Sequence, residues 1–551
     1  MKEIIRFAFA PAALCMSMGA LAQTPTATPI TNVVVIFQEN VSFDHYFGTY
    51  PVPQNNKGET PFTALPLTPT VNGFTPELLK NNPNKNAAGT AQANPIRLTP
   101  AQAYTCSQNH SYGPEQQAVD SGLMDLFPKF VGRTTSQGCT NDGTTNLGYY
   151  DGNTVTAMWN YAQNFSLNDN SFDSTFGPST PGAINLISGQ TFNGILHFGS
   201  GSAGNAFPNQ VGVTITDIGD FDAFMDDCGA DHGGTVTTTS TLEMKGKNIG
   251  DLLNAAGVTW GWFEGGFTPT TAATATTPAV CNASHAGHPG VPNPVAPFVT
   301  GPDIHGPVTD YVSHHAPFMM YTSTANPHHL PPTSVNTVGK SGDPANHNYD
   351  TTWFFKALSN GNLPAVSFVK APAYEDGHPG NSDPLSEQNW VVNVINAVMQ
   401  SPNWQSTAIF IAYDDSDGWY DHVNGPIVSP SATTADALAG AGNCGSPLSG
   451  ANPARCGHGP RLPLLAISPW ANPNTVDHTS TDQASIINFI ESNWNLGFID
   501  GPAAPANGQA SFDRNAGTLM NMFNFSGPPS ASAVLLNCNG TIATATPALC
   551  P

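Results

Sequence analysis

The chain has 551 residues, of which only 10% are charged, well below the roughly 25% of an average soluble protein. Acidic residues outnumber basic ones by 39 to 16, and the net charge is −23. This negative charge argues against nucleic acid or an anionic membrane as the main partner. With 53 glycines and 49 prolines, the composition indicates a loop-rich globular protein that is long enough to bury a large core.

The first 22 residues contain the three parts of a secretory signal in order. Lys2 and Arg6 form a basic start, an apolar stretch follows to Met18, and Ala20-Leu21-Ala22 is a small-residue cleavage site. No later apolar run approaches the ~20 residues of a membrane span. We therefore expect Sec-type export with cleavage after Ala22. The mature protein is expected to be secreted or periplasmic, with no transmembrane segment.

The first strong structural signal after this leader is the run from Val33 to Phe37, which is β-branched or aromatic throughout. Such a run is typical of a strand that is buried on both faces of a parallel sheet. Glu39 and Asn40 follow it at the edge where open α/β sheets place their ligands. Taken alone, such a pair is more often a loop cap. Ser42 then precedes an aromatic segment and reads as a helix cap.

The middle of the chain alternates helical patterns, strands and loops. Residues 48–100 read as an ordered loop or lid segment. The Gly-Pro-Ser-Thr-Pro turn at 177–181 places Ser179 on a rigid bend. Three stretches read as insertions: 193–240, 267–300 and 429–455. Helical spacing of apolar residues predicts helices over 154–165, 248–256, 386–399 and 485–494, and apolar runs predict strands over 258–264, 363–372 and 461–470.

A second fully apolar strand, residues 406–413, ends in Asp414 and Asp415. It repeats the arrangement of the first strand, in which oxygen ligands follow a buried run. Strands that alternate with helices predict an α/β fold: a mainly parallel sheet sandwiched by helices, with loop insertions. We expect a single domain over residues 23–551, with the three insertions named above.

Carboxylates from both strand ends are expected to lie together. Without a cation they would repel one another and their pKa values would rise, whereas a divalent ion would neutralise them. Ligation by oxygen atoms favours Ca²⁺, Mg²⁺ or Mn²⁺ over Zn²⁺, although carboxylates also bind zinc. One divalent metal ion of open identity is therefore the expected cofactor.

Nine cysteines occur, and Cys15 lies in the signal segment. The even number that remains predicts disulfides in an exported chain. Pairing of sequence neighbours is the simplest arrangement, whereas zinc binding is disfavoured because no Cys-x-x-Cys motif occurs. The expected pairs are Cys106–Cys139, Cys228–Cys281, Cys444–Cys456 and Cys538–Cys550.

Several motifs together resemble the bacterial phosphoesterase family that unites phospholipases C with secreted acid phosphatases. These motifs are FQENVSFDHYFGTYP, FGPSTPG, HHAPFMMY, EDGHPG, YDDSDGWYDHV and RLPLLAISPW. The resemblance runs from about Thr31 to Asn495. It implies a fold similar to that of alkaline phosphatases and arylsulfatases, and hydrolysis of small phosphoester substrates.

The resemblance also assigns roles to individual residues. It implies that Ser179 is the nucleophile and that three histidines bind the phosphate group: His110, His315 and His378. His314, the residue before His315, stays an alternative to it. The metal ligands that it implies are Glu39, Asn40, Ser179, Asp414 and Asp415. Activation of a serine by a metal is also the simpler chemical account, because no Gly-x-Ser-x-Gly motif surrounds Ser179.

The chain departs from the phospholipase branch at two of these positions. Asp415 replaces a glutamate and Ser179 replaces a threonine, and the tail after Asn495 leaves no room for the C-terminal β-domains of larger phospholipases. The leading hypothesis is therefore a secreted, metal-dependent acid phosphatase that acts through a phosphoserine. The alternative is a phospholipase C that cleaves phosphodiester lipid head groups. A non-catalytic, metal-stabilised binding protein is the third hypothesis.

Overall fold

The computed structural model describes residues 25–133, 142–197, 213–229, 240–285, 307–438, 440–503 and 509–551. The expected signal segment lies outside the described residues, as does Cys139, so neither the leader nor the Cys106–Cys139 pair is tested. The other three expected disulfides are present: Cys228–Cys281, Cys444–Cys456 and Cys538–Cys550. In the described part of the chain, no helix combines the length and the apolar character that crossing a membrane requires.

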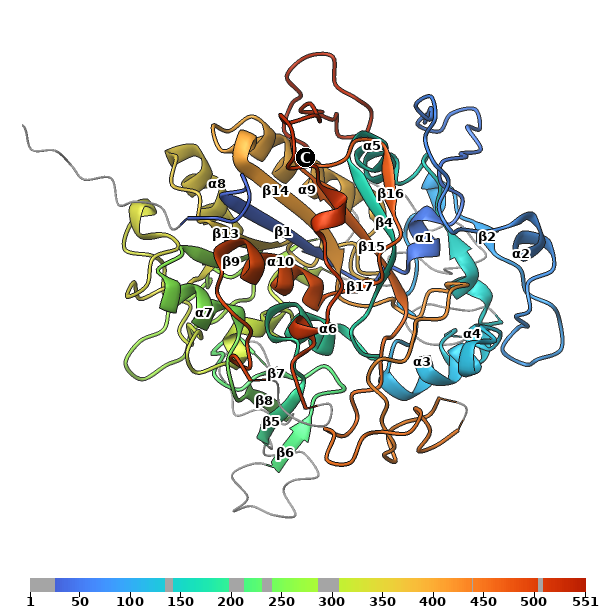
Figure 1. The fold of residues 1–551 in the computed structure, drawn as a ribbon, viewed down its shortest axis with the longest axis horizontal. Coiled ribbons are helices and arrows are strands. Elements are labelled where there is room, and N and C mark those ends of the chain that lie inside the picture. The colour runs from blue at the N-terminus through green and yellow to red at the C-terminus, as the bar shows by residue number, and fades with distance from the viewer. Residues whose placement is uncertain are drawn as a thin grey trace, which may run out of the picture.

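A large mixed sheet organises the molecule (Figure 1). Its strands lie in the order β12, β9, β13, β1, β14, β15, β4 and β16, and β17 pairs with β4. From β12 to β14 all neighbours are parallel, whereas β15 is antiparallel to both β14 and β4. The strand bounds are Asn348–Asp350 (β12), Trp260–Glu264 (β9), Val366–Lys370 (β13), Asn32–Gln38 (β1), Thr407–Tyr413 (β14), Arg461–Ile467 (β15), Ser166–Phe172 (β4), Thr475–Asp477 (β16) and Thr481–Asp482 (β17).

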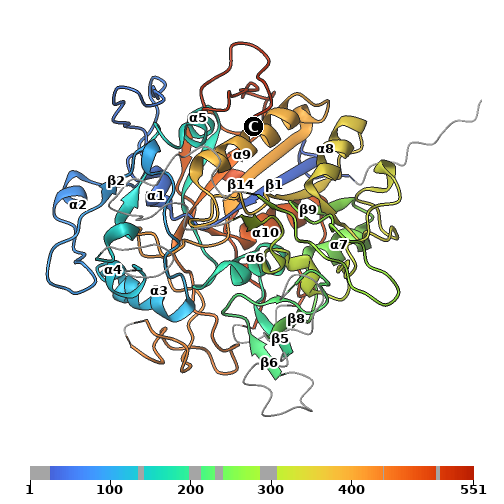
Figure 2. The ribbon, with the colours of Figure 1, turned by 180° about the vertical axis from the view of Figure 1, so that it is seen from behind.

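Helices cover both faces of this sheet and enclose two separate cores. Along β1, Val34 and Ile36 face the first core, and Val33 and Val35 face the second, as the two-residue period of a strand requires. The first core contains α5 (Thr156–Asn164), α8 (Thr351–Asn360) and α9 (Pro384–Met399), and the second contains α6 (Ser179–Ser188), α7 (Ile249–Ala256) and α10 (Ala484–Trp494). Figure 1 shows α10 over one face, and Figure 2 shows α9 over the other. The predicted α/β sandwich is confirmed.

Local capping explains where several helices begin. Ser42 caps α1 (Phe43–Phe47) by accepting a hydrogen bond from the backbone N–H of His45, as predicted. The carboxylate of Asp383 accepts from the N–H groups of Leu385 and Ser386 at the start of α9, where Pro384 occupies the first position. These caps satisfy backbone donors that a helix terminus leaves without partners.

The remaining elements lie outside the main sheet. Residues 193–240 contribute to a small sheet of β5 (Phe192–His197), β6 (Val213–Thr216), β7 (Asp222–Ala223) and β8 (Thr241–Met244). Two short pairs are β2 (Ile96–Arg97) with β3 (Gly148–Tyr149), and β10 (Ser284–His285) with β11 (Val308–Thr309). The further α-helices are α2 (Pro76–Lys80), α3 (Tyr112–Val119) and α4 (Phe127–Phe130).

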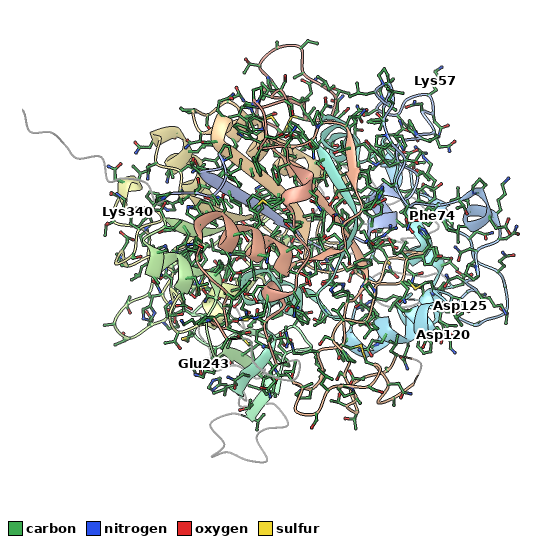
Figure 3. All side chains as sticks on the ribbon, viewed as in Figure 1. Lys57, Phe74, Asp120, Asp125, Glu243 and Lys340 are labelled. Atoms are coloured by element: carbon green, nitrogen blue, oxygen red, sulfur yellow. A yellow bond between two sulfur atoms is a disulfide. The ribbon has the colours of Figure 1, made fainter. Side chains whose placement is uncertain are left out.

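The long segment from 48 to 100 is ordered, as predicted. Phe74, labelled in Figure 3, stacks on Tyr420 with ring centroids 6.1 Å apart and meets Tyr149 edge-on at 5.4 Å. Arg97 binds the carboxylates of Glu59 and Asp151. The backbone N–H of Phe74 also donates to the carbonyl oxygen of Gly48, the C-cap residue of α1, so the segment is held against the end of that helix.

Candidate active site

Two neighbouring strands bring four of the expected ligands together. β1 and β14 are parallel, and Gln38 pairs with Tyr413 at their last residues. Glu39 and Asn40 therefore leave the sheet beside Asp414 and Asp415, and all four residues are buried. The backbone N–H of Asn40 donates to Oδ1 of Asp414 over 2.8 Å. Asn40 has a φ of 59°, a left-handed conformation that asparagine tolerates better than most residues.

Ser179 reaches this edge from a helix. It is the first residue of α6, and its Oγ donates to Oδ2 of Asp415 over 2.9 Å and lies 3.4 Å from Oε2 of Glu39. Gly182, one turn further along α6, explains the close approach. A Cβ at Gly182 would overlap the carbonyl oxygen of Asp414, so only glycine lets the helix pack directly on the end of β14.

The electrostatics of this cluster favour a bound cation. Burial, together with neighbouring carboxylates, raises the pKa values of Glu39, Asp414 and Asp415. Among the described residues, Oδ2 of Asp414 and Oδ1 of Asn40 are buried without a hydrogen-bond partner. Orphaned carboxylate and amide oxygens are the donors that Ca²⁺, Mg²⁺ or Mn²⁺ would satisfy. The residues present therefore fit a divalent metal ion.

Lys370 occupies the opposite side of Glu39. Its Nζ forms an ion pair with Oε1 of Glu39, and both side chains are about 1% exposed. Burial alone would lower the pKa of Lys370, but the charges of Glu39, Asp376 and Asp414 outweigh it and leave the pKa raised. Nδ1 of His315 lies 3.3 Å from the same Oε1 atom. Glu39, His315 and Asp376 thus form a compact group.

The histidines that were expected at the phosphate site lie around this edge. His315, in a short 3-10 turn over Ser313–His315, is the one that contacts Glu39, whereas His314 turns to Asp222. The geometry therefore favours His315. The rings of His110 and His378 lie with centroids 6.3 Å apart.

The protonation of these histidines differs. Nδ1 of His110 lies 3.1 Å from Oδ1 of Asp417. Burial lowers the pKa of His110, but Asp415 and Asp417 outweigh burial and raise it well above its usual value. Burial lowers the pKa of His315, and the neighbouring His314 and Lys370 lower it further. Burial also lowers the pKa of His378, where it outweighs the opposing effect of Asp417. Of the three histidines expected at the phosphate site, His110 is the one whose surroundings favour the charged form.

Two buried carboxylates connect separate segments of the site through hydrogen bonds. Glu115, on α3, accepts hydrogen bonds from the N–H of Gly177 at 2.9 Å and from Oγ of Ser416 at 2.7 Å, so it links the turn before Ser179 to the segment after Asp415. Asp417 accepts from Nδ2 of Asn40 over 3.1 Å while it faces His110. Both carboxylates support other site residues.

The structure brings together Glu39, Asn40, Ser179, Asp414 and Asp415 and places His110, His315 and His378 around them, whereas His314 turns away. It also adds residues that the sequence did not indicate. Glu115, Lys370 and Asp376 were missed. Lys370 ends an apolar strand, and a charged residue that closes such a run is the signal that would have drawn attention to it. Glu115 carries no comparable local signal, because its partners are distant in sequence.

Comparison with curated proteins identifies bacterial phospholipases C as relatives. The non-hemolytic phospholipase C of Burkholderia pseudomallei is 24% identical over 95% of this chain and 63% of the relative. The protein of the same name from Pseudomonas aeruginosa is 26% identical over 91% of this chain and 58% of the relative. Phospholipase C B of Mycobacterium tuberculosis is 22% identical over 92% and 80% of the two chains. The chain spans about six-tenths of the length of the first two relatives.

Among solved structures, a member of the alkaline phosphatase superfamily from Vibrio parahaemolyticus is similar at 11% identity, over 79% of this chain and 76% of that one, with a TM-score of 0.27. That score is too low to support an argument. The sequence profile of the phosphoesterase family, in contrast, matches residues 30–497. Because this match covers most of the chain and includes both strand ends and Ser179, the chain belongs to the phosphoesterase family.

Proposed function

We propose that this protein is an exported, metal-dependent hydrolase of phosphoric esters in which Ser179 is the nucleophile. One observation carries the proposal: the hydroxyl of Ser179 meets the carboxylates of Asp415 and Glu39 at the ends of two parallel strands. A serine at a helix start, among carboxylates and histidines, has the groups that phosphoryl transfer requires.

The metal would be held by Glu39, Asn40, Ser179, Asp414 and Asp415. When bound, it would neutralise part of the carboxylate charge and lower the pKa of the serine hydroxyl. The orphaned oxygens of Asn40 and Asp414 support this assignment. Such a donor set accepts Ca²⁺, Mg²⁺, Mn²⁺ or Zn²⁺, and elemental analysis identifies the ion.

The residues of the chain supply the proton transfers. Asp415 accepts the hydrogen bond of Ser179 and is placed to take its proton as the oxygen attacks phosphorus. The new Ser–O–P bond forms while the bond to the leaving oxygen breaks, and that oxygen takes a proton from a histidine. His110, which Asp415 and Asp417 keep charged, is the acid that we assign. Water then attacks the phosphorus of the phosphoserine and gives a proton to His110. The bond between phosphorus and the Ser179 oxygen breaks, that oxygen takes its proton back from Asp415, and phosphate or a phosphomonoester is released.

The relatives favour a phosphodiester lipid as substrate, so phospholipase C activity becomes the first candidate. Three curated proteins that match more than nine-tenths of this chain are named phospholipase C. Phosphomonoesterase activity, the leading hypothesis from the sequence, is the second candidate. It is supported by Ser179 and Asp415, which replace the threonine and glutamate expected in the phospholipase branch.

A two-substrate assay tests the proposal. Purified protein is assayed with p-nitrophenylphosphorylcholine and with p-nitrophenyl phosphate, and the bound metal is measured by elemental analysis. We expect turnover of the diester to exceed turnover of the monoester, and the Ser179→Ala variant to lose both. The reverse preference would support the acid phosphatase. No turnover of either ester by metal-loaded protein would overturn the enzyme assignment and favour a binding protein.

A further inference from the structure

Lys370 is the last residue of β13, next to β1 in the sheet. Val366 and Phe368 precede it at two-residue intervals and belong to the second core, the one that contains α6. The alternation of a strand therefore directs Lys370 to the same side as Ser179. Its side chain is about 1% exposed. Because lysine is almost never fully buried without a partner, the groups around Lys370 must compensate its charge.

The surroundings of Lys370 have the composition of a cation site. Glu39, His315 and Asp376 each offer one ligand atom, and these atoms all lie within 4.8 Å of one another. All three residues are buried, and Oδ2 of Asp376 has no hydrogen-bond partner among the described residues. Two carboxylates and an imidazole are a donor set that divalent metals accept.

The ammonium of Lys370 already contacts this group. It pairs with Oε1 of Glu39, the atom that also lies 3.3 Å from Nδ1 of His315. The other oxygen of Glu39, Oε2, faces Ser179. Oε2 of Glu39 therefore faces the nucleophile and the proposed metal, whereas Oε1 contacts the ammonium group of Lys370.

We propose that Lys370 replaces a second divalent ion in this site. The inference rests on the proposed metal centre. An ammonium supplies a permanent single charge and three donors, but it cannot exchange ligands or bind substrate as an open metal does. The centre then binds one exchangeable ion, on the Ser179 side of Glu39. With no second ion on the other side of Glu39, protonation of the leaving group falls to the histidines.

Metal stoichiometry tests this role without reference to turnover. Wild type and variants are dialysed against increasing Mn²⁺, and bound metal per chain is measured by elemental analysis. We expect one ion in wild type and in Lys370→Arg, which keeps the charge, and two in Lys370→Met. The double variant Lys370→Met/Asp376→Asn should return to one, because it loses a carboxylate of the second position.

A second readout is the magnetic coupling between two Mn²⁺ ions in the electron paramagnetic resonance spectrum, which only Lys370→Met should show. A folded Lys370→Met variant that binds one ion or none would overturn the proposal. If that variant does not fold, the metal content of the wild type still tests the proposal. Two bound ions per wild-type chain would contradict a site that Lys370 fills. Failure of the proposed function is separate: it would appear as wild type that binds one ion but hydrolyses neither ester.

Discussion

Gly182→Ala tests whether close packing of α6 on β14 positions the nucleophile. A Cβ at this position would overlap the carbonyl oxygen of Asp414 and lie 2.8 Å from its carbonyl carbon, where ordinary contacts begin near 3.4 Å. The helix must then retreat by more than the roughly 0.6 Å between these two distances, because the carbonyl oxygen lies closer to the added Cβ than the carbon does. Such a shift lengthens the 2.9 Å hydrogen bond from Ser179 to Asp415 to the limit of hydrogen bonding.

Two opposing free-energy contributions determine how much Gly182→Ala changes the stability of the fold. Overpacking costs about 1–3 kcal/mol, and replacing a helical glycine by alanine returns up to about 1 kcal/mol, so the fold should survive. Activity should fall by about 10- to 100-fold, because misplacement of reacting groups by 1 Å can cost about 10² in rate.

The assay compares kcat for the better p-nitrophenyl ester with the midpoint of urea unfolding. Gly113→Ala is the matched control: this glycine is also in the first turn of a helix, α3, and its Cβ would find ordinary contacts at 3.6 and 3.8 Å. Wild-type kcat in Gly182→Ala, or an equal loss in Gly113→Ala, would refute the reasoning.

Three further predictions address the metal, the pH dependence of stability and the disulfides. Asp414→Asn should lose bound metal and activity together, because it removes a charge and a strong ligand; stoichiometric metal with near-normal turnover would contradict this. Burial and Asp513 raise the pKa of Glu491 from 4.5 to about 10. The contribution of protonated Glu491 to the stability of the folded state is therefore complete below pH 4.5 and is lost as the pH rises toward 10. Glu491→Gln should therefore melt above wild type at pH 8 and equal it near pH 4; a constant difference would argue against a buried neutral carboxyl. Thiol titration of denatured, unreduced protein should find no free cysteine, and two or more would contradict the four expected bridges.

Local patterns in the sequence were sufficient for the elements that carry the ligands. The apolar runs before Glu39 and before Asp414 specify buried strands, because a continuous apolar stretch suits no exposed position. The turn around Ser179 was also recognisable from its prolines. The start of α6 at Ser179 itself was not predicted, because the prolines indicated only a rigid turn at 177–181.

Long-range relations were beyond local patterns. The antiparallel pairing of β15 with β14 was not predictable, because an apolar strand has the same pattern in either direction. Glu115 and Asp376 act through partners on other elements, so their spacing in sequence carries no signal. Lys370 was overlooked because one lysine at the end of a strand normally marks its exposed end, whereas here it lies beside Glu39.

The central claim is that Ser179 attacks phosphorus, and trapping the intermediate tests it most directly. Wild-type protein is mixed with excess substrate, quenched in acid within the first turnovers, digested and searched by mass spectrometry for a phosphorylated peptide. The account predicts phosphate on Ser179, and none on any peptide of Ser179→Ala, whose turnover should fall by roughly 10³-fold or more. Phosphate on another residue, or normal turnover by the alanine variant, would contradict it.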